Sequence, residues 1–287
     1  MTTHTHQTAP TQYVEANGVR FAYRRFGKTG GLPLVFNMHF NGSMDHWDPA
    51  ITDGFAQDRE VILFNNAGVS SSSGEVPATI REMGANAIAF ITTLGVAKVD
   101  VLGFSVGGFI AQEIALQAPD LARRLILLST GPRGGESMAN TTPEMQEIYS
   151  ATYDHPDLIW LRGFFTASEP SQAAGREFIR RIRLRSKDRD PDMSEKVIPT
   201  QLGAINNWGA PQESFDYLKA INQPTLVVTG GNDVIIYPVN SFILQQNLPN
   251  AQLIVYPDAG HGSHYQYPEL FVRSASSFLS TASPWKV

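Results

Sequence analysis

The segment between residues 99 and 117 constrains the fold of this chain more than any other part of its sequence. An apolar run from Val99 to Leu102 leads directly into Gly-Phe-Ser-Val-Gly at 103–107, and a helical pattern then continues to Gln117. Glycines two positions before and two positions after Ser105 let neighbouring backbone pass closely through a sharp turn. A strand, turn and helix of this kind hold a serine in a strained conformation with its Oγ exposed, so the spacing predicts that Ser105 is a nucleophile.

Two later loops carry the residues that a nucleophilic serine needs. Asp233 follows the apolar run 225–229, and His261 follows the run 253–256. A neutral His261 can take the Ser105 proton only if its other ring nitrogen donates to a fixed acceptor, which Asp233 provides. Serine, acid and histidine also occur in the chain order that a strand-turn-helix nucleophile uses, so we predict a catalytic triad of Ser105, Asp233 and His261.

Neighbouring residues offer alternatives for these roles. Asp258 could be the acid, but only Asp233 ends a different strand from the histidine, as the triad geometry requires. His264 lies three residues after His261, and we expect it to be a pocket-wall or surface histidine. The glycine-rich turn could instead bind a dinucleotide, yet its spacing is not G-x-G-x-x-G and the next strand does not end in an acidic residue.

Acyl transfer also needs two backbone N–H groups that bind the negatively charged oxygen of the tetrahedral intermediate. Val106, the residue after the nucleophile, supplies one of them. The second should come from the loop at residues 38–43, after the third strand, whose small residues suit close backbone approach. Either Phe40 or Asn41 is the donor in this loop.

The apolar pattern predicts eight strands. Residues 12–16 and 19–26 alternate around Asn17-Gly18, which favours a hairpin, and short buried-type runs follow at 34–38, 61–64, 99–104, 125–128, 225–229 and 253–256. Helical patterns alternate with these runs at 80–94, 106–117, 239–246 and 269–279. We therefore predict an α/β fold with a mostly parallel eight-stranded sheet and helices on both of its faces.

The alternation stops between residues 134 and 211, where helical stretches, including an Arg-rich one at 175–187, occur without a strand. We predict a helical cap, or lid, inserted after the sixth strand over the sheet edge where open α/β folds bind ligands. Residues 1–133 and 212–287 then form the core domain and residues 134–211 the cap; a separate domain is the alternative. We expect the aromatic side chains of the cap to pack against one another within the cap more than to line a pocket. These are Tyr149, Trp160, Phe164, Phe165 and Trp208.

Composition excludes several classes of function. The 287 residues include no cysteine, so disulfides, thiolate catalysis and Cys-ligated metal sites are excluded. The net charge of -5 gives no basic surface for a nucleic acid or an anionic membrane, and we expect neither partner. Residues 1–10 lack the apolar stretch of a secretory signal and are expected to be a frayed tail, and no apolar run is long enough to span a bilayer. We therefore expect a cytoplasmic protein.

The serine turn, the Asp233 and His261 loops and the loop at 38–43 together resemble the α/β-hydrolase fold superfamily, over about residues 13–279. Members of that family usually carry His-Gly-X after the third strand, and here Phe40 stands where that glycine is found. The resemblance implies a serine esterase or lactonase that needs no metal and no other cofactor.

The expected activity is cleavage of an ester or lactone bond in a small, apolar substrate, through an acyl-enzyme on Ser105. A serine nucleophile favours this chemistry over that of dehalogenases and epoxide hydrolases, which attack with aspartate. The same triad could instead support perhydrolase or haloperoxidase-like chemistry, C–C bond hydrolysis or a lyase reaction. A third interpretation is a non-catalytic small-molecule receptor that uses the cap pocket.

Overall fold

A central eight-stranded sheet organises the chain in the computed structural model, which describes residues 4–155 and 157–282. The strand order is β1-β2-β4-β3-β5-β6-β7-β8. The first two strands form the predicted antiparallel hairpin, β2 pairs antiparallel with β4, and every later pairing is parallel. The strands are β1 (Gln12–Ala16), β2 (Val19–Gly27), β3 (Leu34–Asn37), β4 (Glu60–Phe64), β5 (Val99–Phe104), β6 (Ala122–Leu128), β7 (Thr225–Gly230) and β8 (Ala251–Tyr256).

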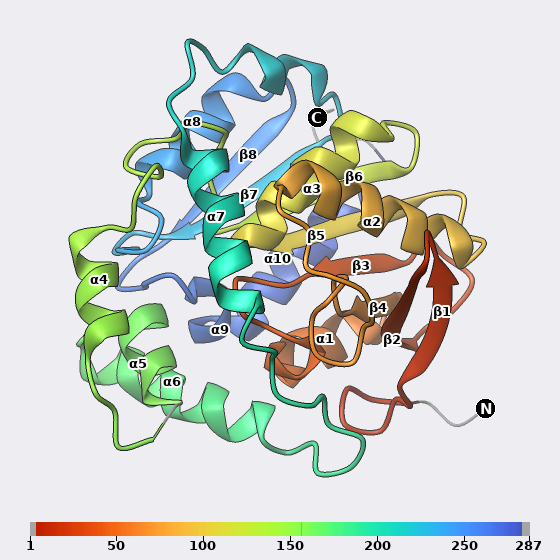
Figure 1. Ribbon diagram of the computed structural model, residues 1–287, viewed down its shortest axis with the longest axis horizontal. Helices are drawn as coiled ribbons and strands as arrows, with labels where there is room; N and C mark the ends of the chain where they lie inside the picture. Colours follow the sequence, from red (N-terminus) through yellow and green to blue (C-terminus); the bar gives the residue numbers. More distant parts are fainter. Residues whose placement is uncertain (1–3, 156, 283–287) are drawn as a thin grey trace.

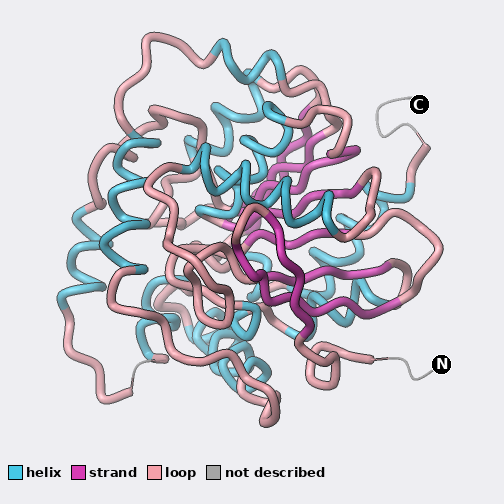
Figure 2. Tube along the Cα trace, turned by 45° about the vertical axis from the view of Figure 1, so that its right-hand side comes forward, coloured by secondary structure: helices cyan, strands magenta, loops and turns pink. Residues whose placement is uncertain are grey.

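Helices cover both faces of this sheet, as Figure 1 shows. One face packs against α2 (Ile80–Thr93), α3 (Val106–Gln117) and α8 (Val239–Asn247), and the other against α1 (Pro49–Ala56), α9 (Ser263–Gln266) and α10 (Pro268–Ser280). The strands fan with the usual twist between these two layers (Figure 2). The predicted α/β fold is confirmed, including the fully buried central strands β3 to β5 that were recognised from consecutive apolar residues.

The predicted helical insertion after β6 is also present. It contains α4 (Pro143–Ser150), α5 (Leu158–Phe164), α6 (Glu169–Ile182) and α7 (Val197–Gly209), which lie along one side of the sheet in Figure 1. A short 3-10 helix, η2 (Asp216–Ala220), leads back to β7, and another, η1 (Met44–His46), precedes α1. The Arg-rich helix predicted at 175–187 was misplaced: α6 begins at Glu169, capped by Ser168, and ends at Ile182.

A cluster of buried charges joins the segment between α6 and α7, residues 183–196, to the core. Arg24 is fully buried and donates to Asp45 Oδ1 at 2.5 Å, while Arg185 and Asp190 lie beside the same pair. Charges removed from water in this way must be paired, and breaking one such pair costs about 3–5 kcal/mol. The segment at residues 183–196 is therefore held firmly against the core.

The expectation of a frayed amino terminus is wrong for residues 4–10; residues 1–3 lie outside the described part of the chain. The Arg185 guanidinium donates to the carbonyl oxygens of His6, Gln7 and Ala9 at 2.9 to 3.0 Å. His6 is itself buried, with Nδ1 3.0 Å from Thr52 Oγ1. A partner far along the chain thus orders a polar segment that has no local signal for structure. No helix in the described residues has the length and apolar character needed to cross a bilayer.

Candidate active site

The turn between β5 and α3 places Ser105 at the carboxyl edge of the sheet. Its backbone angles are φ 56° and ψ -118°, which confirms the strained conformation predicted from the glycine spacing. Three hydrogen bonds hold it there: Ser105 N–H donates to Leu128 O at 2.9 Å, and Ser105 O accepts from Thr130 Oγ1 and from Gly108 N–H at 2.8 Å each. A non-glycine residue in such a region costs about 1–3 kcal/mol, which the surrounding structure must offset.

The two flanking glycines are required because backbone lies against both: the end of β3 against Gly107, and the turn itself against Gly103. A Cβ atom on Gly107 would lie 1.9 Å from Asn37 O, and one on Gly103 would lie 2.1 Å from Gly107 O. Backbone atoms cannot move away as a flexible side chain could, so only glycine fits at either position. This close approach sets the loop after β3 directly beside Ser105.

His261 and Asp233 form a buried pair, with Nδ1 of the histidine 2.8 Å from Oδ2 of the acid. The second carboxylate oxygen, Oδ1, accepts from the N–H groups of Ile235 and Ile236 at 2.9 and 3.0 Å. A carboxylate can only accept here, so Nδ1 carries the imidazole proton and Nε2 presents its lone pair. The loops after β7 and β8 therefore bring together the two residues that the sequence pairs.

The competing residues lie in other surroundings. Asp258 accepts hydrogen bonds from the hydroxyls of Thr166 and Ser168 at 2.7 and 2.5 Å, and it fixes the chain between α5 and α6. His264 is fully buried against the ring of Phe104, with centroids 4.3 Å apart, and it does not line the pocket described below. The expectation that His264 is a pocket-wall or surface histidine was therefore wrong.

The geometry distinguishes the two candidate donors in the loop after β3. Asn41 N–H donates to the side-chain oxygen of Gln201 on α7 at 2.8 Å, so its one hydrogen is already used. In the described part of the chain, neither Phe40 N–H nor Val106 N–H has a hydrogen-bond partner. The sequence offered no signal for Gln201, because its partner lies 160 residues away. Val106 and Phe40, which line the same pocket as Ser105, thus keep free N–H groups.

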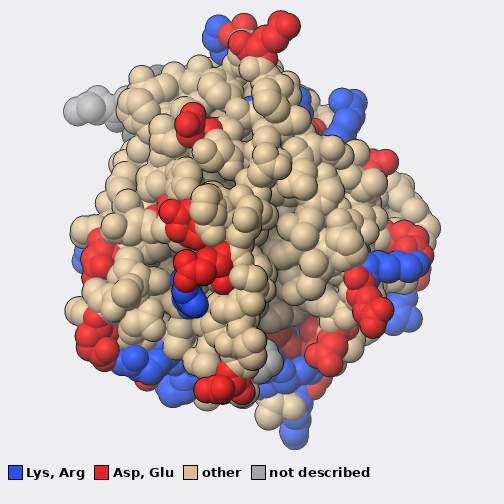
Figure 3. All heavy atoms as spheres, turned by 60° about the vertical axis from the view of Figure 1, so that its left-hand side comes forward, with Lys and Arg blue, Asp and Glu red and all other residues tan. Residues whose placement is uncertain are grey.

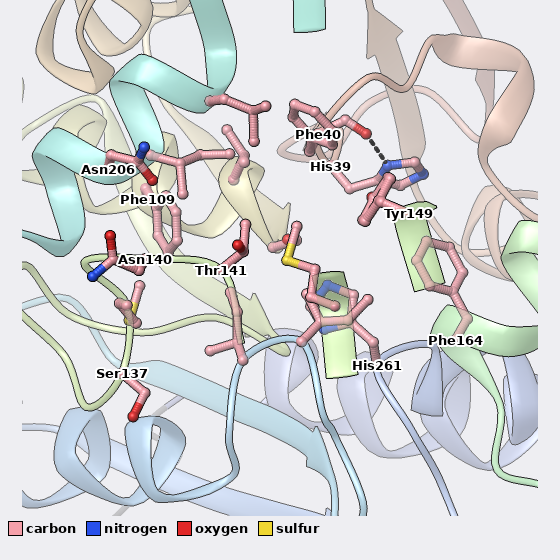
Figure 4. Close-up of a pocket in the computed structure, with 18 of the residues that line it drawn as sticks. His39, Phe40, Phe109, Ser137, Asn140, Thr141, Tyr149, Phe164, Asn206 and His261 are labelled. Carbon is pink, nitrogen blue, oxygen red and sulfur yellow. Dashed lines mark hydrogen bonds between the residues drawn. The ribbon is translucent and has the colours of Figure 1, made fainter. Parts of the chain in front are cut away.

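A pocket of about 660 Å³ of empty space opens between the sheet edge and the cap. Ser105 and His261 both line it, and Ser105 Oγ has no hydrogen-bond partner among the described residues. Tyr149, Trp160 and Phe164 of the cap also line it, which contradicts the expectation that the cap aromatics pack mainly within the cap (Figure 4). The expectation holds for Phe165, which packs against Phe178 of α6, and it is wrong for Trp208, whose ring stacks on Phe109 of the core helix α3 with centroids 5.2 Å apart.

The lining of the pocket contains no charged side chain of the Asp, Glu, Lys or Arg type among the described residues. The lining includes the polar side chains of Ser137, Asn140, Thr141 and Asn206, and Figure 4 shows Ser137, Asn140 and Asn206 on the side of the pocket away from His261. Figure 3 shows one face of the molecule, on which uncharged side chains cover most of the area and most of the charged ones lie toward its edges. Within the described residues, no group of three or more His, Asp and Glu side chains could hold a metal ion.

Buried histidines make the folded state sensitive to acid. Burial lowers the pKa of His39, beside the pocket, to about 3, and burial together with the nearby Arg24 lowers the pKa of His6 to about 3. The unfolded chain, with histidine pKa values near 6.5, binds more protons between these limits, so stability falls as pH drops below about 6.5. We expect each histidine to remove about 2 kcal/mol from the free energy of unfolding between pH 7 and pH 5.

Urea unfolding at the two pH values measures this loss. A His6→Asn variant, which keeps a donor for Thr52, should lose roughly half of the pH dependence that the two histidines contribute. An unfolding free energy that is the same at pH 7 and pH 5 in the unsubstituted protein would contradict the assignment of these two histidines as neutral and buried.

The sheet order, the helical insertion and a serine turn that lines the same pocket as a paired histidine are the architecture of α/β-fold hydrolases. Comparison with known families agrees: residues 33–268 match the model of the alpha/beta hydrolase fold. The chain therefore belongs to the alpha/beta hydrolase fold family.

Three individual proteins are similar over most of the chain. A solved alpha/beta hydrolase fold protein from Chitinophaga pinensis is 43% identical, with a TM-score of 0.91 over 97% of this chain and 100% of that one. The structure of Est816, described as an N-acyl homoserine lactone degrading enzyme, is 26% identical, with a TM-score of 0.70 over 93% and 100%. A Mycobacterium tuberculosis protein, BpoC, provisionally described as a non-heme bromoperoxidase, is 28% identical over 88% of this chain and 95% of its own.

Proposed function

We propose that this protein is a serine hydrolase that cleaves an ester or lactone bond of a small, neutral and mainly apolar substrate through an acyl-enzyme on Ser105. The observation that carries the proposal is the convergence of Ser105 and the His261–Asp233 pair on one pocket that also has two free backbone N–H groups. The 26% identity to Est816 over most of both chains supports a lactone as one possible class of substrate.

The first half of the reaction forms the acyl-enzyme. Ser105 Oγ attacks the carbonyl carbon while His261 Nε2 takes its proton, and Asp233 stabilises the imidazolium that results. Val106 N–H and Phe40 N–H bind the oxyanion, helped by the positive end of the α3 dipole. When the tetrahedral intermediate collapses, the C–O bond to the alcohol breaks and His261 returns the proton to the departing oxygen.

The second half releases the acid. His261 removes a proton from a water molecule, which attacks the acyl carbon, and the same N–H groups bind the second oxyanion. The bond to Ser105 Oγ then breaks, and His261 returns the proton to the serine. No oxidant, reductant or further co-reactant enters this cycle.

The experiment is a panel of p-nitrophenyl esters and lactones of varied chain length, assayed with and without hydrogen peroxide, together with labelling by a fluorophosphonate. Hydrolysis without peroxide and a covalent adduct on Ser105, located by peptide mass spectrometry, are the expected results. Turnover only in the presence of peroxide would assign the same triad to perhydrolase chemistry. The absence of both turnover and adduct would reject the proposal.

The charge-free pocket predicts a preference for neutral substrates. Burying a carboxylate beside Trp160 and Phe164 with no Lys or Arg in the lining leaves that charge unpaired, which is costly. We expect a neutral acyl ester to have a kcat/KM at least about 100-fold above that of the analogue whose acyl chain ends in a carboxylate, as an unpaired charge costing about 3 kcal/mol implies. Equal values for the matched pair would show that another group, outside this lining, meets the charge.

A further inference from the structure

The peptide unit between Phe40 and Asn41 is held from both sides. Its carbonyl oxygen accepts from His39 Nδ1 at 2.7 Å, which Figure 4 marks with a dashed line, and its N–H donates to Gln201 Oε1 at 2.8 Å. A carbonyl can only accept and an N–H can only donate, so these partners fix both the His39 tautomer and the orientation of the Gln201 amide. The peptide plane therefore cannot rotate without breaking two hydrogen bonds.

The second of these bonds comes from the cap and not from the core. Gln201 lies on α7, is 2% exposed and does not line the pocket, whereas its neighbours Leu202 and Ile205 do. Its side chain reaches past the pocket wall to the loop after β3. A residue placed in this way cannot contact the substrate, and its effect on chemistry must pass through the backbone that it holds.

The backbone at this point is in a conformation that needs support. Asn41 has φ 52°, in the left-handed region, which non-glycine residues other than Asn and Asp rarely adopt. The preceding peptide carries the free Phe40 N–H, and the two peptide planes share the Phe40 Cα as their hinge. If the bond to Gln201 is lost, the backbone at Asn41 can leave this conformation by shifting the Phe40 Cα, and the Phe40 N–H, which is attached to that atom's residue, shifts with it.

We propose that Gln201 is a positioning residue: its side-chain oxygen holds the Asn41 N–H and thereby keeps the Phe40 N–H directed at the oxyanion. The inference rests on the proposed function, because Gln201 supports a backbone group that acts in the proposed reaction. It also ties the cap to the chemistry, since α7 must be seated for the oxyanion donor to be in place. Asn41 N–H is not a donor to the oxyanion, because Gln201 already takes its hydrogen.

The two candidate oxyanion donors, Phe40 N–H and Asn41 N–H, predict opposite effects on kcat when Gln201 is replaced. Gln201→Met keeps the length of the side chain and removes the acceptor. Gln201→Glu keeps an oxygen that accepts from Asn41 N–H, and at this buried position it does so as the neutral acid. If Phe40 N–H is the donor, Gln201→Met lowers kcat about 10- to 100-fold, up to the effect of a misplaced group and below that of a donor lost outright. If Asn41 N–H is the donor, the same substitution frees it, and kcat stays equal or rises.

The measurements are kcat and KM on the best neutral ester, and the inhibition constant of a boronic acid that forms a tetrahedral adduct with the serine. We expect Gln201→Met to lower kcat with KM within about twofold, and to weaken the boronic acid by the same factor as kcat, because both report on the oxyanion site. Gln201→Glu should restore kcat to within about threefold of the unsubstituted protein. A loss in kcat with unchanged boronic acid affinity would overturn the proposal.

A second cap glutamine supplies the control for general damage to the cap. Gln172 on α6 donates to the carbonyl oxygens of Leu161 and Thr166, so Gln172→Met loosens the cap without touching the loop after β3. It should leave the boronic acid constant unchanged even if thermal stability falls. An equal weakening in Gln172→Met and Gln201→Met would assign the effect to cap stability alone.

Fluorophosphonate labelling separates failure of this inference from failure of the proposed function. If Ser105 of the unsubstituted protein is not labelled, the proposed function is rejected, and with it the role of Gln201. If Ser105 is labelled at the same rate in the unsubstituted protein and in Gln201→Met, only the role of Gln201 is rejected. Slower labelling in Gln201→Met, restored in Gln201→Glu, supports both.

Discussion

Replacing Ser105 with alanine should lower kcat/KM on any true ester substrate by about 1000-fold or more, the loss expected when a covalent nucleophile is removed and only binding and the oxyanion donors are left. The side chain makes no hydrogen bond within the described residues, so its removal breaks no structural contact. The fold should therefore persist, and substrate affinity should change little. The measurement is steady-state hydrolysis of the best ester, with thermal unfolding recorded on the same preparation.

A buried serine outside the pocket provides the matched control. Ser241 on α8 is 1% exposed, and its Oγ has no partner within the described part of the chain. Ser241→Ala removes the same hydroxyl from a similar environment and should keep kcat/KM within about twofold, as distant substitutions do. Ser105→Ala with activity close to that of Ser241→Ala would mean that ester cleavage in this protein does not pass through Ser105.

The sheet and its loops could be predicted because their determinants are local or follow from chain order. Consecutive apolar residues such as 125–128 identify strands buried on both faces, and parallel strands bring their carboxyl ends to one edge. Ser105, Asp233 and His261 each follow such a strand, so their positions in the sequence predicted that they would meet. The helix α1 was missed even though Asp48 and Pro49 give it a capped start, because its eight residues are too few for a clear period.

The helical insertion was predicted, but its attachments to the core could not be, because the partners lie far apart along the chain. Arginines on an amphipathic helix usually end in water, yet Arg181 donates to the buried Asp48 at 2.6 and 2.8 Å. Arg185 is 3% exposed and secures the amino-terminal segment. No local pattern distinguishes an arginine that ends in water from one that meets a carboxylate more than 130 residues away.

The prediction that the aromatic residues of the cap pack within the cap was wrong for several of them, for a related reason. Trp160, Phe164 and Phe165 occur within six residues, and all three are of types that usually pack in a core. Only the register of α5 decides which of them faces the pocket: Trp160 and Phe164 are four residues apart, one turn of a helix, and they share the face toward Ser105. Phe165 follows the end of the helix and packs against Phe178 instead.

The role of Asp233 leads to the second large expected effect. Asp233→Asn keeps an oxygen for the N–H groups of Ile235 and Ile236, so the loop after β7 should hold its shape. The new amide, however, presents donor hydrogens to His261 Nδ1, which must then accept. The proton moves to Nε2, and the lone pair that should take the Ser105 proton is lost. We expect kcat on the best ester to fall about 10⁴-fold, the size of the same acid-to-amide change in a serine protease triad.

Asp258→Asn is the matched control, because it makes the same chemical change on the neighbouring loop. That carboxylate accepts from the hydroxyls of Thr166 and Ser168, and an amide oxygen can keep one of these bonds. Its kcat should stay within about threefold of the unsubstituted protein. Fluorophosphonate labelling of Ser105 should slow in Asp233→Asn and not in Asp258→Asn, since the labelling reaction needs the same base. The reverse pattern, with Asp258→Asn the slower variant, would transfer the acid's role to residue 258, and equal activity of both variants would leave His261 without an orienting acid in this reaction.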